Sequence, residues 1–133
     1  MRKTKLLNSI LSYEISKMGH FDTIAIADAG LPIPRGIRRI DLAVSEGIPD
    51  FMSVLEAVLR ELKVQKATVA AEMQDNNPAL FKTLNSLMQK EGAAFTAVPH
   101  EDFKIQTTTC VAVVRTGEMK PYANIILESG VVF

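Results

Sequence analysis

The chain has one cysteine, no tryptophan and only two histidines among its 133 residues. A single cysteine excludes an intramolecular disulfide, and so small a supply of cysteine and histidine speaks against a Cys/His zinc site. Aromatic residues make up 6% of the chain. This low share disfavours an aromatic stacking platform for single-stranded nucleic acid.

An excess of charge of either sign is also lacking, because fifteen basic residues balance fifteen acidic ones. Nucleic acids and anionic membranes attract proteins through a basic field, so neither is expected as a partner. No apolar stretch approaches the roughly 20 residues of a membrane span. Polar residues between Asn8 and Lys17 interrupt the apolar run that follows the basic N-terminus, unlike the core of a signal peptide. We therefore expect a cytoplasmic protein.

Apolar residues are nevertheless abundant, at 47% of the chain, which suggests that part of the surface is hidden in an oligomer. The clearest helix is predicted to begin after Asp50, with apolar residues recurring at helical spacing from Phe51 to Leu62. Other helical patterns cover residues 6–18 and 76–91, with a short helical turn at 100–103. Short apolar runs predict strands at residues 23–28, 39–43, 66–71, 95–98, 110–115 and 125–133.

Alternation of strands and helices predicts an α/β fold, a single domain over residues 1–133. We expect a mainly parallel central sheet flanked by helices, because short all-apolar strands suit a sheet that is covered on both faces. The last two strands, 110–115 and 125–133, are predicted to form a C-terminal hairpin, which would make the sheet mixed.

Familiar chemical motifs are missing. The chain has no glycine-rich phosphate loop and no G-x-S-x-G nucleophile elbow. The one cysteine, Cys110, is predicted to lie in an apolar strand and is interpreted as a buried, inert thiol. Chemistry must therefore come from other polar side chains.

Two polar residues flank the first predicted strand. His20 precedes it and is either a surface imidazole near a helix C-terminus or a general acid/base, since histidine titrates near neutral pH. Asp28 ends it and is either a turn residue or a carboxylate that orients a ligand or a histidine. Glu72 and Arg115 also end predicted strands, where ligands bind in such sheets, although we interpret Glu72 as solvated.

Further candidates lie in the second half of the chain. His100 is either a residue at a helix start or a functional imidazole, and Glu118 is a loop carboxylate of either kind. Tyr122 and Asn124 form either a turn, in which the asparagine takes an unusual backbone angle, or a pair of neutral hydrogen-bonding groups. Two histidines with an aspartate, a tyrosine and an asparagine suit proton transfer on a neutral polar molecule.

Several motifs in a fixed order resemble the D-ribose pyranases, a sugar mutarotase family that also includes L-fucose mutarotase. The resemblance covers essentially the whole chain. The motifs that carry it are Leu7-Asn-Ser-Ile-Leu11, Gly19-His20, Ile26-Ala-Asp-Ala-Gly-Leu-Pro-Ile-Pro34, Ile40-Asp-Leu42, Gly47-Ile-Pro49, His100-Glu-Asp-Phe-Lys104, Arg115-Thr-Gly-Glu118 and Pro121-Tyr-Ala-Asn124.

This resemblance implies an isomerase that interconverts the β-pyranose and β-furanose forms of D-ribose without a cofactor or metal. It implies that His20 is the catalytic acid/base and that Asp28, His100, Tyr122 and Asn124 bind the sugar. It also implies a homodecamer of two pentameric rings, with sites between adjacent subunits. The alternatives are a mutarotase for another sugar such as L-fucose, a non-catalytic sugar-binding accessory of sugar transport, and an enzyme acting on another polar metabolite.

Overall fold

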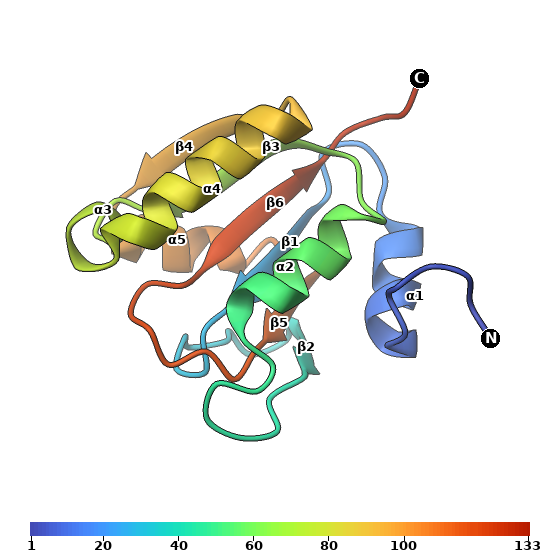
Figure 1. The fold of residues 1–133 in the computed structure, drawn as a ribbon, viewed down its shortest axis with the longest axis horizontal. Helices are drawn as coiled ribbons and strands as arrows, with labels where there is room; N and C mark the ends of the chain where they lie inside the picture. Colours follow the sequence, from blue (N-terminus) through green and yellow to red (C-terminus); the bar gives the residue numbers. More distant parts are fainter.

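Six strands form one sheet in the order β2-β5-β1-β6-β3-β4 in the computed structural model, which describes residues 1–133 (Figure 1). The strands are β1 (Thr23–Ala27), β2 (Arg38–Asp41), β3 (Val64–Ala70), β4 (Ala94–Val98), β5 (Ala112–Arg115) and β6 (Ile125–Ser129). The helices are α1 (Ser9–Lys17), α2 (Phe51–Leu59), α3 (Met73–Asn76), α4 (Pro78–Glu91) and α5 (His100–Thr107). The predicted α/β class is confirmed.

The sheet is mixed, as predicted, but the predicted C-terminal hairpin is wrong. β5 pairs in parallel with β1 and β2, whereas β6 pairs antiparallel with β1 and β3. β1 therefore lies between the two strands that were expected to pair. Its residues 24–27 have no exposed surface, and only a central position covers both faces of so apolar a strand. The connection over residues 116–124 passes the end of β1 instead of turning tightly.

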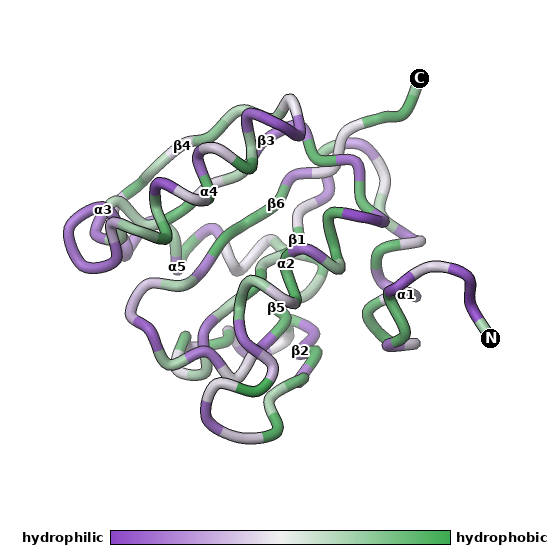
Figure 2. The backbone as a smooth tube through the Cα atoms, viewed as in Figure 1, coloured by the Kyte–Doolittle hydropathy of each residue, from purple (hydrophilic) through white to green (hydrophobic).

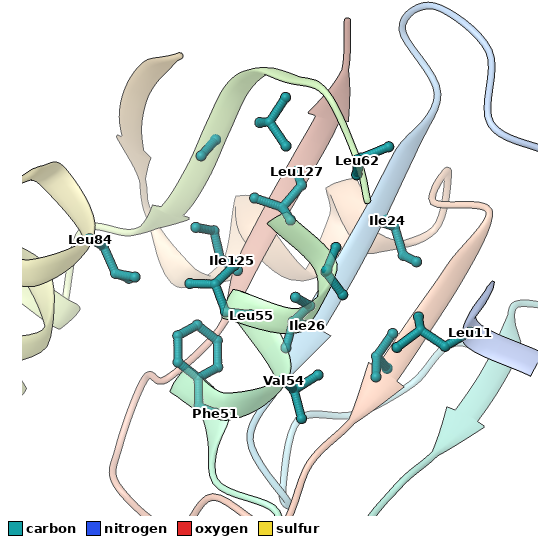
Figure 3. Packing of buried hydrophobic residues seen from close by; sticks show 14 of the residues in the cluster. Leu11, Ile24, Ile26, Phe51, Val54, Leu55, Leu62, Leu84, Ile125 and Leu127 are labelled. Carbon is teal, nitrogen blue, oxygen red and sulfur yellow. The ribbon is translucent and has the colours of Figure 1, made fainter. Parts of the chain in front are cut away.

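Helices cover the two faces of the sheet unequally. α2 and α4 lie on one face, where Ile24 and Ile26 of β1 pack with Phe51, Leu55 and their neighbours in a cluster of 22 buried residues (Figures 1 and 3). α5 lies on the other face, where Ala25 and Ala27 contribute to a cluster of seven buried residues around Phe103. The period-two alternation of large and small side chains along β1 thus assigns the thicker core to the α2–α4 face.

The predicted N-terminus of α2 is confirmed, since Asp50 caps it by accepting a hydrogen bond from the Ser53 N–H at 3.4 Å. Hydrophilic and hydrophobic residues alternate along α4, as expected for a helix with one face on a core, whereas α2 is mostly hydrophobic (Figure 2). The predicted helical turn at 100–103 extends to Thr107 as α5. None of the helices combines the length and the apolar character needed to cross a membrane.

Candidate functional site

Four of the five predicted site residues lie at one edge of the sheet, where β1 to β5 end and β6 begins. We call this the carboxyl edge, and the opposite edge the amino edge. Asp28 follows β1 and His100 follows β4, whereas Tyr122 and Asn124 immediately precede the antiparallel β6. The fold therefore gathers residues from three separate parts of the chain at the edge where such sheets bind ligands.

Asp28 and Asn124 hold each other by two hydrogen bonds. The Asp28 N–H donates to Asn124 Oδ1 at 2.9 Å, and Asn124 Nδ2 donates to Asp28 Oδ2 at 2.8 Å. Asn124 is buried, and Asp28 Oδ1 also accepts from the Gly30 N–H at 3.0 Å. These contacts fix the orientation of the carboxylate before any ligand arrives, which lowers the cost of ordering it on binding.

His100 and Tyr122 form the second pair at this edge. Their rings meet edge to face with centroids 5.1 Å apart. The buried Nδ1 of His100 has no hydrogen-bond partner in the chain. An unpaired buried nitrogen is costly unless a ligand or water completes it, so His100 is suited to bind a hydroxyl group.

Backbone strain marks both halves of the predicted site. Only two residues other than glycine have a left-handed φ, Phe21 at 70° next to His20 and Tyr122 at 56°. Such conformations persist where the surrounding structure imposes them, often at functional sites. The turn is present, but the residue with the unusual backbone angle is Tyr122 and not the asparagine of the turn alternative; the Tyr122 carbonyl accepts from the Asn124 N–H at 2.8 Å.

The interpretation of Glu72 as a solvated side chain is wrong. Its two carboxylate oxygens accept from the backbone N–H of His100 at 3.1 and 2.9 Å, so it ties the end of β3 to the start of α5. Hydrogen bonds from its own backbone N–H and then from that of His100 lower the pKa of Glu72 below its ordinary 4.5, and the His100 imidazole adds to this. Glu72 therefore positions His100.

A Glu72→Ala variant should weaken substrate binding, because the backbone at His100 loses its anchor. We expect KM to rise by roughly three- to tenfold with a smaller change in kcat. A lowered pKa means that the anchor is fully formed above pH 4.5 and is lost as the pH falls through the folded-state value. Acid should therefore raise the wild-type KM below pH 4.5 by a larger factor than the KM of Glu72→Ala, because only the wild type has this anchor to lose. Glu101→Gln, an exposed neighbour on α5, is the control, and equal KM values for wild type and Glu72→Ala would contradict the anchoring role.

Two further charged residues at this edge have structural roles. Glu118 accepts hydrogen bonds from the backbone N–H of Phe51, Met119 and Lys120 at 3.0–3.2 Å, so its carboxylate joins its own loop to the start of α2. Arg115 donates from Nη1 to both oxygens of Asp41 at 3.2 Å and from Nε to the Ala29 carbonyl at 3.0 Å. Both fasten the loops around Asp28.

A cleft of about 560 Å³ opens beside Asp28 at the carboxyl edge. Its walls are the loop after β1, residues 43–46 after β2, and the connection from Arg115 to Pro121. Of the five predicted site residues only Asp28 lines it, and the paired rings of His100 and Tyr122 lie outside its lining. The cleft thus leads to Asp28 from one side of the Asp28–Asn124 pair.

His20 lies at the amino edge, away from the other four residues. It precedes β1, and its Nε2 lies 2.9 Å from Oε1 of Gln65, at the beginning of β3. Glu72, which anchors His100, follows the other end of the same strand. Seven residues of β3 span about 20 Å. One chain therefore holds His20 and the Asp28 group too far apart to touch one small molecule.

Cys110 is buried between α5 and β5, with 4% of its surface exposed. Burial raises the pKa of its thiol, and a hydrogen bond from the Thr23 hydroxyl opposes that rise in part. The interpretation as a buried thiol is confirmed, although the residue precedes β5 instead of lying within it.

Known proteins match this chain along its whole length. It matches the RbsD / FucU transport protein family over residues 1–132. D-ribose pyranases of Pediococcus pentosaceus and Coprothermobacter proteolyticus are each 53% identical to it, with full coverage of both chains. The structure of Bacillus subtilis RbsD complexed with D-ribose is 41% identical with a TM-score of 0.95, covering both chains completely. Fucose mutarotase from Streptococcus pneumoniae, solved with L-fucose, is 27% identical with a TM-score of 0.79, again over both whole chains.

Proposed function

This chain belongs to the RbsD / FucU transport protein family, and we propose that it converts D-ribose between its β-pyranose and β-furanose rings at a site shared by two subunits. It is an enzyme of the isomerase type, a function carried by the relatives of about 50% identity over the full length. The observation that carries the shared site is the separation of His20 from Asp28, His100, Tyr122 and Asn124 at opposite edges of the sheet.

The reaction needs proton transfer and no change of oxidation state. As the pyranose opens, the anomeric hydroxyl loses a proton, the C1–O5 bond breaks, and O5 gains a proton. The open aldehyde then rotates, O4 loses its proton and attacks C1, and the carbonyl oxygen gains a proton to become the anomeric hydroxyl of the furanose. A histidine both takes and gives protons near neutral pH, so His20 serves as the general acid/base of these steps.

The carboxyl-edge residues bind the sugar in this proposal. The Asp28 carboxylate accepts hydrogen bonds from hydroxyl groups, and the unpaired Nδ1 of His100 supplies one more partner. Tyr122 offers a phenol group and Asn124 fixes the carboxylate. A sugar lacking the matching hydroxyl would leave these groups unpaired, which is the basis for selecting one sugar over another.

A second copy of the chain brings His20 to this group of residues. We infer a cytoplasmic homo-oligomer in which each contact within a ring uses two different surfaces, one carrying the amino edge and one the carboxyl edge. Such head-to-tail contacts form a ring where the rotation between neighbours closes. Two stacked rings of five, a decamer, are the assembly that we propose. Exposed apolar side chains near the amino edge, Phe21 and Phe133 among them, support burial of this region against a neighbour.

Saturation-transfer NMR on equilibrated D-ribose tests the activity, because it measures pyranose–furanose exchange directly. Protein should increase the exchange rate without changing the ring populations. L-fucose in a parallel sample tests the alternative of a mutarotase for that sugar. Ribose binding without faster exchange would support a non-catalytic sugar-binding accessory of sugar transport instead. Light scattering after size exclusion tests the assembly, and a monomer at micromolar concentration would contradict the shared site.

A further inference from the structure

His20 is held by Gln65, which is held in turn by Glu128, and neither the sequence motifs nor the sugar-binding group assigns a role to these two residues. Gln65 Oε1 lies 2.9 Å from His20 Nε2, and Gln65 Nε2 donates to Glu128 Oε1 at 2.8 Å. The three side chains form a continuous chain of hydrogen bonds from a carboxylate through an amide to an imidazole. They come from the turn before β1, from β3 and from β6.

A β-bulge places Gln65 in this chain. The antiparallel register of β3 and β6 pairs Val64 with Ser129 and Lys66 with Glu128, so Gln65 is the extra residue of β3. An inserted residue has no partner in the ladder, and bulges are used near active sites to redirect a side chain. Gln65, which regular pairing would turn to the opposite face from Lys66 and Glu128, reaches both Glu128 and His20.

The backbone around His20 is also fixed. The Phe21 N–H donates to the Ser129 carbonyl at 2.9 Å, and the Ser129 N–H donates to Asp22 at 2.8 Å. The Phe21 ring stacks on the imidazole with centroids 3.7 Å apart. His20 is exposed, yet its ring is held on one face by Phe21 and at Nε2 by Gln65.

The donor and acceptor roles of the three side chains fix the direction of this chain of hydrogen bonds. The Glu128 carboxylate only accepts, so the Gln65 nitrogen must face it, and the Gln65 oxygen must face His20. That oxygen also only accepts, so the proton of neutral His20 resides on Nε2. Rotating the amide by half a turn would set two oxygens against each other and two nitrogens against each other.

We infer that Gln65 and Glu128 are positioning residues for His20, which fix its Nε2–H tautomer and leave Nδ1 as the nitrogen that exchanges protons with the sugar. This inference rests on the proposed function of His20, while the tautomer itself does not. For metal-ligating histidines, the partner that sets the tautomer and orientation of the imidazole is worth about 10–100-fold in affinity or activity, and we expect an effect of the same size here. The proposed sugar-binding group includes neither residue.

Three variants test the direction of the hydrogen bonds from Glu128 through Gln65 to His20. Gln65→Met keeps the length of the side chain and removes the acceptor, so His20 should relax to the mixture of tautomers of a free peptide histidine. Gln65→Lys supplies a donor between Glu128 and His20, so the proton should move to Nδ1. Lys66→Gln is the control, because it removes a charge beside Glu128 without entering the chain of hydrogen bonds.

Two-bond ¹H–¹⁵N spectra of histidine-labelled protein report the tautomer without substrate. The chain has only two histidines, so the His20 signals are assigned by their loss in His20→Ala. We expect a single Nε2–H tautomer in wild type and Lys66→Gln, a mixture in Gln65→Met, and Nδ1–H in Gln65→Lys. A wild-type His20 with the mixture of a free peptide histidine would overturn the inference.

Exchange kinetics provide the second readout. We expect kcat to fall about tenfold in Gln65→Met and about a hundredfold in Gln65→Lys, with KM for ribose nearly unchanged in both. A wild-type kcat in Gln65→Met, alongside an inactive His20→Ala, would overturn the positioning role. A wild-type protein that fails to accelerate exchange would reject the proposed function instead, and the tautomer spectra would decide the fixed Nε2–H state independently.

Discussion

A His20→Ala variant should lose ring exchange by about 10²–10⁴-fold in kcat, the usual contribution of a general acid/base. Its affinity for ribose should change far less, because Asp28, His100 and Asn124 lie at the other edge of the sheet. His20 is exposed, so its removal should leave the unfolding transition in place. Saturation-transfer NMR measures the rate, and calorimetric titration measures the affinity.

Mixing His20→Ala with a second inactive variant, Asp28→Asn, tests whether two subunits share one site. Asp28→Asn should bind ribose poorly, while His20→Ala should bind it without turnover. If each site takes His20 from one subunit and Asp28 from its neighbour, random mixed rings contain about one intact site in four. Co-expressed variants should therefore recover about a quarter of wild-type activity. Failure to recover activity in verified mixed rings would mean that each chain supplies its whole site.

Much of the fold was predictable because local patterns dominate it. The recurrence of apolar residues after Asp50 gave α2 its start and its buried face, including Phe51 and Leu55. The short and almost wholly apolar run of β1 placed Asp28 at the carboxyl edge, where ligands bind in such sheets. These predictions depend only on residues that lie close together in the sequence.

Strand pairing was less predictable, because adjacency along the chain does not decide it. The last two strands were expected to pair with each other, yet β1 lies between them. Nothing local distinguishes a hairpin from a connection that passes over a third strand. Burial decides the pairing, because the almost wholly apolar β1 is stabilised most by a central position, where both faces of the strand are covered.

Supporting residues of the site were the least predictable. Glu72 reaches His100 across 28 positions of sequence, and Gln65 reaches Glu128 across 63. Gln65 moreover depends on a register shift that leaves no mark in the composition of β3. The separation of His20 from Asp28 could be predicted, since a residue before a strand and a residue after it lie at opposite edges of a sheet. That geometry predicts a second copy of the chain as soon as both residues are assigned to one ligand.

Gly117 is the position where a single methyl group should do most damage to the fold of the site. A Cβ atom there would lie 2.5 Å from the Ser45 carbonyl oxygen and 2.6 Å from both the N and the O of Ile48. All three atoms belong to the backbone, so no side chain can rotate away. The Gly117 carbonyl also accepts from the Gly47 N–H at 2.6 Å, and its N–H donates to Pro49 at 2.8 Å. A Gly117→Ala variant must therefore separate two backbone segments that are hydrogen-bonded to each other.

We expect Gly117→Ala to lower the free energy of unfolding by about 3 kcal/mol, at the upper end of the usual cost of overpacking. Urea denaturation followed by circular dichroism measures this loss. Gly30→Ala is the matched control for stability, because its Cβ atom would meet nothing closer than Asp28 Oδ1 at 3.8 Å. Equal stability of the two variants would contradict the close approach of the two loops.

The same substitution should disturb ribose binding, because the displaced segment leads directly into the site. Glu118 follows Gly117 and joins this loop to the start of α2 and to Ala29, the residue after Asp28. Tyr122 and Asn124 lie further along the same connection, so a shift at Gly117 moves the partner of the Asp28 carboxylate. At temperatures where Gly117→Ala remains folded, KM for ribose should therefore rise more than kcat falls. His20 lies at the other edge of the sheet, and its proton-transfer step should persist in every molecule that still binds the sugar.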